Sequence, residues 1–304
     1  MGALLALAAC GSSEKSNATR QGTKAPPATP EFKNETLTIS GIPDQDPEKL
    51  NRLHGGVASY LADALGVEVE YVPVVDYTAA VSSFRLGDLD AVWFGGLTGV
   101  QARLQTPGAK LVAQRDIDAE FQSVFIANTS ANLDPIAEVG GLDTVKGHSV
   151  TFGSESSTSG RLMPQYFLDQ AGVTVDDLEG QPGFSGSHDA TIELVEAGTF
   201  EVGALNRQVW ETAVAAGTVD PSTVEVIFET PTYADYHWLA RPNLDTKFGP
   251  GFTRAFQNAI LGLDLDVPEQ AAVLELFAAA RFIPTEADNY ARIEAIGRKL
   301  GLIN

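Results

Sequence analysis

Several features that often reveal a protein's function are scarce or missing in this chain of 304 residues. No apolar run approaches the ~20 residues of a transmembrane helix. Lys and Arg number 20 against 40 Asp and Glu, and the net charge of -20 argues against nucleic acid, whose phosphates need a basic face. The histidines have no partners at metal-ligand spacing, and no Gly-x-Ser-x-Gly nucleophile elbow occurs. We therefore expect no metal, no cofactor and no enzymatic activity.

What the chain does contain suits a folded protein that holds small ligands through local groups. Its length fits two ordinary domains, and 44% hydrophobic residues can fill their cores. The acidic surface repels small anions at long range. An anionic ligand would therefore have to be held by local dipoles and hydrogen-bond donors.

The N-terminus resembles the lipobox of bacterial lipoproteins. Leu7, Ala8 and Ala9 precede Cys10, the only cysteine of the chain. The resemblance implies a signal remnant at residues 1–10, with Cys10 lipid-modified and the protein anchored outside the cytoplasm; an incidental apolar start with a buried thiol is the alternative. The positive segment that opens such signals is missing, so we expect the true translation start to lie a few codons upstream.

The remainder divides into a tether and two lobes. Residues 11–35, rich in Ser, Thr, Ala, Pro and charge, cannot bury enough apolar surface to fold and are expected to be flexible. From Leu37 onward strands alternate with helices, which predicts an α/β protein with mainly parallel sheets. We predict a discontinuous first lobe made of residues 36–120 and 229–304, and a second lobe made of residues 121–228.

Two extended segments, residues 121–128 and 224–230, are expected to be the crossings between the lobes. Three helices are expected to complete the chain after a strand at residues 236–241. Two α/β lobes joined by two crossings enclose a cleft, and ligands of open α/β sheets bind outside the carboxyl ends of the strands.

A run of hydroxyl residues at one strand end is the strongest sign of a binding site. Ser156, Ser157, Thr158 and Ser159 follow a short strand and open an amphipathic helix. The first turn of a helix has N–H groups without intrahelical partners, and its dipole favours negative charge. A single N-cap would need only one hydroxyl. The run therefore predicts an anion site.

Three other groups of residues fall on strand ends in the same way. They are Asp44 with its neighbours at residues 43–45, the pair Gly95 and Gly96, and His188 after Ser187. We expect His188 to contact the ligand, although it could be an ordinary strand-to-helix cap. This repeated placement predicts that the groups meet in one cleft.

With these features, the chain resembles the solute-binding proteins of phosphonate-type ABC importers from about Leu37 to the C-terminus. The most specific matches are the turn at residues 157–160 and the turn at residues 186–189. The resemblance implies a two-lobed periplasmic-binding-protein fold of type II. It also implies that the hydroxyl run, His188 and Tyr77 hold phosphonate oxygens, and that the partners are a permease and an ATPase. We expect a monomer.

Three further segments resemble a subgroup known as selenate-binding proteins. They span residues 41–46, 93–103 and 229–236. Phosphonate binders commonly carry Gly-Pro and an aromatic residue where this chain has Gly95 and Gly96. Neutral Asn206 stands at a strand end where a carboxylate would be needed for an ammonium group, which favours a compact inorganic or simple alkyl oxyanion.

Asp44 distinguishes between these ligands. A carboxylate beside a bound dianion is unfavourable unless the ligand keeps a proton to donate. Phosphate and phosphonate can do so, whereas selenate and sulfate are fully ionised near neutrality. If Asp44 faces the ligand, a phosphorus oxyanion is favoured, and if it only caps a helix, selenate remains open.

The remaining alternatives concern two tyrosines and the function as a whole. Tyr233 and Tyr236 either line the cleft or pack at the hinge. A ligand sensor for a receptor kinase is a second possible role of the same fold. A hydrolase with Ser157 as nucleophile and His188 as its base is a third.

Overall fold

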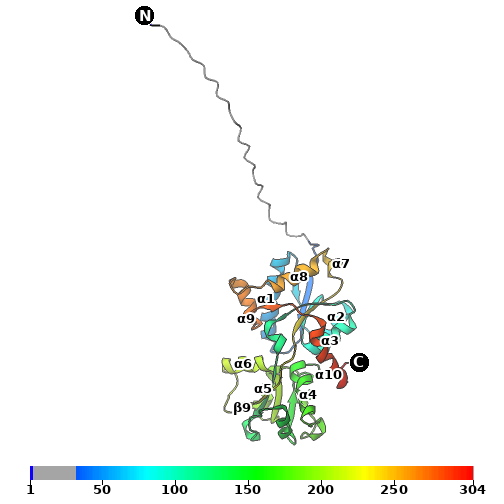
Figure 1. The fold of residues 1–304 in the computed structure, drawn as a ribbon, viewed down its shortest axis with the longest axis vertical. Coiled ribbons are helices and arrows are strands. Elements are labelled where there is room, and N and C mark those ends of the chain that lie inside the picture. Colours follow the sequence, from blue (N-terminus) through cyan, green and yellow to red (C-terminus); the bar gives the residue numbers. More distant parts are fainter. Residues whose placement is uncertain (3–31, 304) are drawn as a thin grey trace. The chain divides into compact units, whose positions relative to one another are not determined.

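Two β-sheets organise the described part of the chain, which is residues 1–2 and 32–303 of this computed structural model. The first sheet has the order β11-β4-β10-β3-β1-β2, and the second has the order β7-β6-β8-β5-β9. We call each sheet with its flanking helices a lobe (Figure 1). The first sheet contains β1 (Leu37–Gly41), β2 (Val69–Tyr71), β3 (Ala91–Phe94), β4 (Lys110–Arg115), β10 (His237–Ala240) and β11 (Phe282–Ile283). The second contains β5 (Ser123–Asn128), β6 (Val150–Phe152), β7 (Gly183–Phe184), β8 (Val202–Asn206) and β9 (Val224–Glu229).

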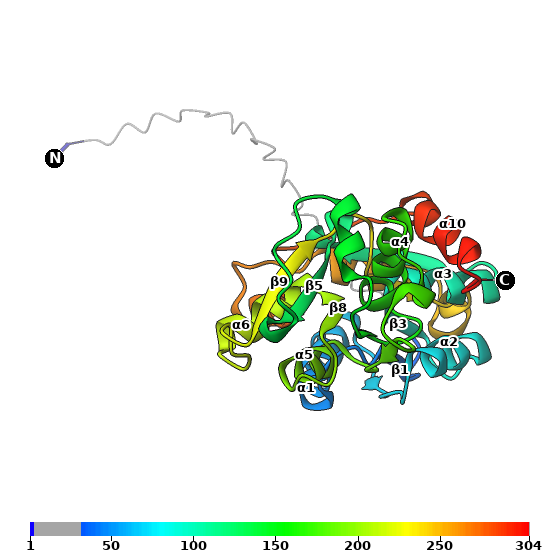
Figure 2. The ribbon, with the colours of Figure 1, turned by 90° about the horizontal axis from the view of Figure 1, so that it is seen from below.

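Both sheets are mixed, so the expectation of mainly parallel sheets is wrong. In the first sheet β1 pairs in parallel with β2 and β3, but β10 runs antiparallel to β3 and β4. In the second, β6 is parallel to β7 and β8, whereas β5 is antiparallel to β8 and β9, which lie beside it in Figure 2. Strand β11 is also antiparallel to β4, and β5 and β10 each follow a crossing. The chain enters each sheet there without a helical crossover, which parallel pairing would need.

Seven helices of the first lobe surround its sheet in the described residues: α1 (Pro47–Leu65), α2 (Tyr77–Leu86), α3 (Gly96–Gln105), α7 (Leu244–Phe248), α8 (Phe252–Leu261), α9 (Pro268–Leu276) and α10 (Ala291–Lys299). Helix α1 ends at Gly66, whose φ of 67° is left-handed and suits glycine. Four helices, not the expected three, follow β10, because Gly249 and Gly251 interrupt one apolar stretch and divide α7 from α8.

The second lobe has helices on both faces of its sheet. They are α4 (Met163–Gln170), α5 (His188–Glu196) and α6 (Arg207–Ala216), and a π-helical turn, η4 (Thr158–Leu162), leads into α4. Strand β5 is buried throughout: Val124 and Ile126 pack with residues of α5 and α6, while Phe125 joins the larger cluster with Phe167 of α4. Short 3₁₀ turns lie at Asp116–Glu120 (η1), Thr129–Ala131 (η2), Val139–Val145 (η3), Val175–Asp177 (η5) and Ala287–Tyr290 (η6).

The two crossings overlap only the ends of the segments expected from the sequence. Residues 121–128 and 224–230 contain β5 and β9 of the second sheet, and the chain passes between lobes at residues 116–122 and 230–236. The crossings pair with each other at Phe121 and Tyr233, through N···O distances of 2.8 and 3.0 Å. Among the described residues, no helix is long and apolar enough to span a membrane.

Candidate functional site

Five helical segments begin where the two lobes meet. In the first lobe α2 begins at Tyr77 and α3 at Gly96. In the second, η4 begins at Thr158, α5 at His188 and α6 at Arg207. Each start presents N–H groups without intrahelical partners and the positive end of a helix dipole. Together these starts bring the positive ends of several helix dipoles to the place where the lobes meet.

The predicted hydroxyl run is buried from Ser157 onward. Ser157 Oγ accepts a hydrogen bond from the N–H of Gly160 at 2.9 Å and caps the turn. The N–H groups of Thr158 and Ser159 have no hydrogen-bond partner among the described residues. Since buried N–H groups are almost always paired, these two are suited to donate to an anion. Ser156 lies apart from this group: it is half-buried, and its hydroxyl bonds to none of the described residues.

Thr158 also contacts the first lobe directly. Its Oγ1 accepts a hydrogen bond from the N–H of Leu97 at 2.9 Å. A Cβ on Gly95 would lie 3.3 Å from that same Oγ1 and 3.4 Å from Asp235 Oδ1. A Cβ on Gly96 would lie 3.3 Å from a backbone carbonyl of the second crossing. Both glycines therefore allow the lobes to approach closely here.

His188 is a buried, neutral histidine. Burial lowers its pKa to about 4, so it is uncharged near neutrality. Its Nδ1 accepts from the N–H of Asn206 at 3.4 Å, which places the ring proton on Nε2. Nε2 lies 3.5 Å from Ser159 Oγ and 3.4 Å from the Tyr236 hydroxyl. His188 therefore offers a neutral donor to the space beside the hydroxyl run.

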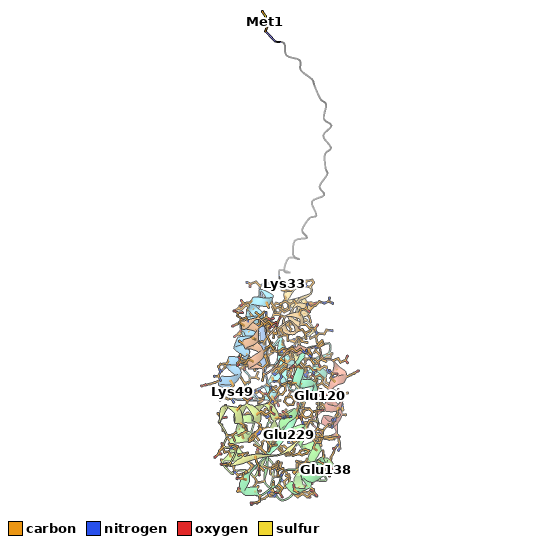
Figure 3. All side chains as sticks on the ribbon, turned by 60° about the vertical axis from the view of Figure 1, so that its left-hand side comes forward. Met1, Lys33, Lys49, Glu120, Glu138 and Glu229 are labelled. Carbon is orange, nitrogen blue, oxygen red and sulfur yellow. The ribbon has the colours of Figure 1, made fainter. Side chains whose placement is uncertain are left out.

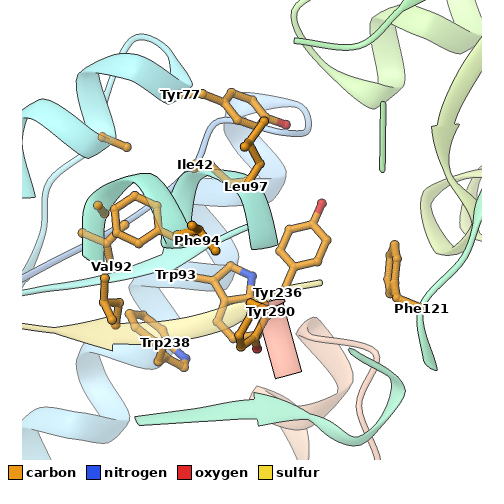
Figure 4. Close-up of a cluster of buried hydrophobic side chains, with 14 of the residues drawn as sticks. Ile42, Tyr77, Val92, Trp93, Phe94, Leu97, Phe121, Tyr236, Trp238 and Tyr290 are labelled. Atoms are coloured by element: carbon orange, nitrogen blue, oxygen red, sulfur yellow. The ribbon is translucent and has the colours of Figure 1, made fainter. Parts of the chain in front are cut away.

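Tyr77 brings a hydroxyl from the first lobe. The residue is buried, and its hydroxyl has no hydrogen-bond partner among the described residues. Figure 4 shows this hydroxyl and that of Tyr236 directed toward the second lobe. Burial and the nearby charge of Asp44 hold the pKa of Tyr77 well above 10, so the phenol keeps its proton and can donate it.

Asp44 faces the region between the lobes and caps no helix. Asp46 caps α1 instead, accepting two N–H groups of its first turn. The Tyr236 hydroxyl donates to Asp44 Oδ2 at 2.7 Å and accepts from Asn206 Nδ2 at 3.3 Å. Burial raises the pKa of Asp44 to about 6, although the Tyr236 hydrogen bond and the charge of Arg115 oppose the shift. Asn206 also caps α6 through its Oδ1.

Asp235 was missed from the sequence. Its Oδ1 accepts the N–H of Gly96 at 2.8 Å, and its Oδ2 has no partner among the described residues. Burial raises the pKa of Asp235 to about 7. Asp235 directly precedes Tyr236 and lies in segment 229–236, which resembles the selenate-binding subgroup. That position is the one feature of the sequence that could have marked Asp235 as a site residue. The crossing has no periodic pattern that could indicate which of its side chains point inward.

Arg115 was also missed from the sequence. It supports the site by contacting Tyr236. Its guanidinium binds both oxygens of Asp118 at 2.7 Å and lies 5.0 Å from the centre of the Tyr236 ring. Such a cation held over a ring fixes the ring's position. The positive charge of Arg115 is thus neutralised by Asp118. The groups beside the hydroxyl run are neutral donors or carboxyls.

Tyr233 occupies the hinge. Its hydroxyl lies 2.6 Å from Ser123 Oγ, which in turn donates to the carbonyl oxygen of Ser159 at 2.7 Å. This chain of contacts supports the hydroxyl run from the crossings. The position favours the hinge role over direct ligand contact.

A cavity of about 570 Å³ adjoins the site on one side. Asp44, Asn206 and Tyr236 line it, together with Trp93 and side chains of α1, α6 and α9. The hydroxyl run does not line this cavity. The hydrogen-bonded residues Asp44, Tyr236 and Asn206 therefore form part of the wall of this cavity.

The family profile described as "ABC transporter, phosphonate, periplasmic substrate-binding protein" matches residues 39–290. This chain belongs to that family. It is therefore an extracytoplasmic substrate-binding protein of an ABC importer and not an enzyme, with a small ligand and the permease and ATPase subunits as partners. Among the described residues, Ser159 Oγ lies 3.5 Å from His188 Nε2, whereas Ser157 Oγ accepts the N–H of Gly160.

Members of this family are similar to the chain over most of its length. A probable phosphite-binding protein of an ABC transporter, PhnD1 of Prochlorococcus marinus, is 49% identical over 278 residues, covering 91% of this chain and 94% of PhnD1. The solved structure of that PhnD1 with methylphosphonate has a TM-score of 0.87 and covers 89% of this chain and 100% of its own. The phosphate-import protein PhnD of Mycolicibacterium smegmatis is 26% identical, covering 76% of this chain and 71% of its own.

Proposed function

We propose that this protein binds a small phosphorus oxyanion, of the size of phosphite or methylphosphonate, between its lobes and delivers it to the permease. The relative that is 49% identical is named as a phosphite-binding protein, and its structure holds methylphosphonate. The donors that we assign to the anion are Tyr77, Ser157, Thr158, Ser159, His188 and the N–H groups at the start of η4. Each of these side chains is neutral and buried, and the first lobe and the second lobe both contribute.

The orientation of Asp44 carries the choice of ligand. Its carboxyl is buried beside Tyr236 and does not cap a helix, so a bound anion must share a proton with it. Asp235 presents a second such carboxyl, and the raised pKa values of about 6 and 7 keep protons available. Phosphorus oxyanions ionise a second time near neutrality and can share a proton, whereas selenate and sulfate bring none. The pair of carboxyls therefore supports phosphite or a simple phosphonate over selenate.

Calorimetry with phosphite, methylphosphonate, phosphate, sulfate, selenate and aminoethylphosphonate tests this proposal. We expect phosphite or methylphosphonate to bind most tightly, and binding to weaken as the pH rises from about 6 to about 9, because both carboxyls then lose their protons. Equal or tighter binding of selenate, or no loss of affinity at high pH, would contradict the assignment of Asp44 to the ligand.

The anchor proposed from the sequence is lipid attached to Cys10, which lies outside the described residues. The support is the lipobox-like order of residues 7–10 and the family's place outside the cytoplasm. Mass spectrometry of protein extracted from membranes should show acylated Cys10 as the first residue. Cys10→Ser should release the protein from the membrane, and an unmodified chain that retains residues 1–9 would refute the anchor.

The proposed working form is a monomer, since Tyr77, Thr158 and His188 all come from one chain. Light scattering of the purified protein with and without phosphite should give the mass of one chain. A dimer that forms only with ligand would contradict this.

A further inference from the structure

A charged contact fastens the two lobes beside the proposed anion site. Asp189 follows His188 at the start of α5, and its carboxylate is turned toward the first lobe. Oδ1 pairs with Lys49 Nζ at 2.5 Å, and Oδ2 accepts the N–H of Asp46 at 2.8 Å. Figure 3 shows Lys49 on α1, at the edge of the first lobe that meets the second.

The same contact completes the start of a helix in the opposite lobe. Asp46 is the N-cap of α1, so Asp189 places a negative charge at the positive end of that helix dipole. One residue earlier, the N–H of His188 donates to the carbonyl oxygen of Asp44 at 2.8 Å. Residues 44–49 of the first lobe and the first two residues of α5 are thus joined at three points, all of which break if the lobes separate.

We propose that Asp189 and Lys49 form a latch that stabilises the closed arrangement regardless of which anion is bound. They act as positioning residues, since both oxygens of Asp189 are occupied by the first lobe and neither residue belongs to the donor set assigned to the anion. The inference rests on the proposed function only in that closure accompanies anion binding. When a ligand binds one conformation, its apparent affinity is scaled by the fraction of protein in that conformation. The latch therefore tightens binding of every ligand by one factor and leaves the selectivity unchanged.

If Asp189 and Lys49 act as a latch, their contribution to the dissociation constant depends on salt. A purely structural role of the two residues predicts no such dependence. The Lys49 and Asp189 side chains are 42% and 20% exposed, so salt screens their attraction in part. Long-range repulsion between an anion and the protein's charge of -20 is also screened, which acts in the opposite direction. The ratio of dissociation constants between a latch variant and the wild type removes this common effect. That ratio should fall toward one as salt rises from about 0.01 M to about 1 M.

Asp189→Asn is the main variant, because it removes the charge and leaves an oxygen for the N–H of Asp46. We expect phosphite and methylphosphonate to bind roughly two- to fivefold more weakly at low salt, by the same factor for both, with the loss in the dissociation rate. Lys49→Met should give a similar loss, and the double variant should lose less than the sum. The matched control is Glu193→Gln, which removes the same charge from an exposed position on α5 without an ion-pair partner among the described residues. An unchanged affinity in Asp189→Asn, or a loss confined to one ligand, would overturn the latch.

A measurement without ligand separates the latch from the proposed function. Spin labels on exposed Asp63 and Glu179, one in each lobe and both replaced by cysteine in a Cys10→Ser chain, report the separation of the lobes. We expect longer distances in Asp189→Asn than in its parent, at low salt and without anion. Identical distances would refute the latch even if phosphite binds. Failure of the parent chain to bind any phosphorus oxyanion would refute the proposed function and leave this comparison valid.

Discussion

At the scale of single residues, the site that we propose offers an anion hydrogen-bond donors, and the described residues place no cation among those donors. The guanidinium of Arg115 is paired with Asp118, and His188 is neutral because burial lowers its pKa to about 4. A lysine or arginine at the anion would attract every anion alike, whereas oriented hydroxyl and N–H groups select by the position of the acceptor oxygens. Among these donors, Thr158 also contacts the other lobe through its side chain, since its Oγ1 accepts the N–H of Leu97.

Replacing Thr158 with Val keeps the shape of the side chain and removes its hydroxyl. A hydrogen bond to a charged group contributes about 1.5–3 kcal/mol, so affinity for phosphite or methylphosphonate should fall roughly tenfold or more. Calorimetry measures this loss directly. Thr158→Ser keeps the hydroxyl and should retain most of the affinity. If valine binds as well as threonine, the hydroxyl run does not hold the ligand.

The raised pKa of Asp44 also affects stability. Its pKa is about 6 in the folded chain against 3.8 ordinarily, so the folded state binds this proton more tightly than the unfolded state does. The stability that the proton contributes is fully present below pH 3.8 and is lost as the pH rises through 6. Asp44→Asn cannot ionise, and its free energy of unfolding should exceed that of the wild type by about 1–3 kcal/mol at pH 8 and match it near pH 4.

Urea unfolding at the two pH values checks this expectation. The control is Asp63→Asn, an exposed position on α1, which should change stability little at either pH. The same Asp44→Asn chain should bind phosphite with a weaker pH dependence than the wild type. A variant that is less stable than the wild type at pH 8 would show that the Asp44 carboxylate is favourable in the fold.

At the scale of elements, the site is built from the starts of helices, and these were largely predictable. The small and hydroxyl residues at strand ends, such as Ser157 and Ser187, are local signals of a helix start. Asp235 and Arg115 come from crossing segments, whose side-chain directions depend on pairing between distant parts of the chain, as between Phe121 and Tyr233. The mixed sheets were missed for the same reason, because the direction of β5 and β10 follows from long-range pairing and leaves no period in the sequence.

A substitution at the start of α3 tests how closely the two lobes must approach each other for the ligand to bind. Gly95→Ala adds a Cβ that would lie 3.3 Å from Thr158 Oγ1, which is tighter than such contacts usually are, and 3.4 Å from Asp235 Oδ1. We expect weaker binding of phosphite or methylphosphonate, by roughly tenfold, with a melting temperature of the ligand-free protein near that of the wild type. Gly55→Ala in α1 is the control, since its Cβ would meet no atom within 4 Å and alanine is the better helix former. Wild-type affinity in Gly95→Ala would mean that α3 does not approach η4 when the ligand is bound.

At the scale of the whole molecule, the donors that we propose come from both lobes, so an anion can contact all of them only when the lobes are together. Tyr77 and the start of α3 belong to the first lobe, and Thr158 and His188 belong to the second. A ligand shifts a conformational equilibrium by its difference in affinity for the two states. Closure also removes water, which strengthens each donor contact. This accounts for the retention of an anion by a protein whose net charge is -20.

Small-angle scattering with and without saturating methylphosphonate tests this closure on the whole chain. The radius of gyration should fall when ligand is added, because hinge motion at the two crossings brings the lobes together. Thr158→Val should need more ligand to reach the same decrease, since it weakens binding and leaves the hinge intact. Sulfate at the same concentration serves as the control and should produce less change. If the radius stays constant while calorimetry shows binding, the anion is held by one lobe alone, and the contacts between Thr158 and Leu97 are a property of the fold that binding does not use.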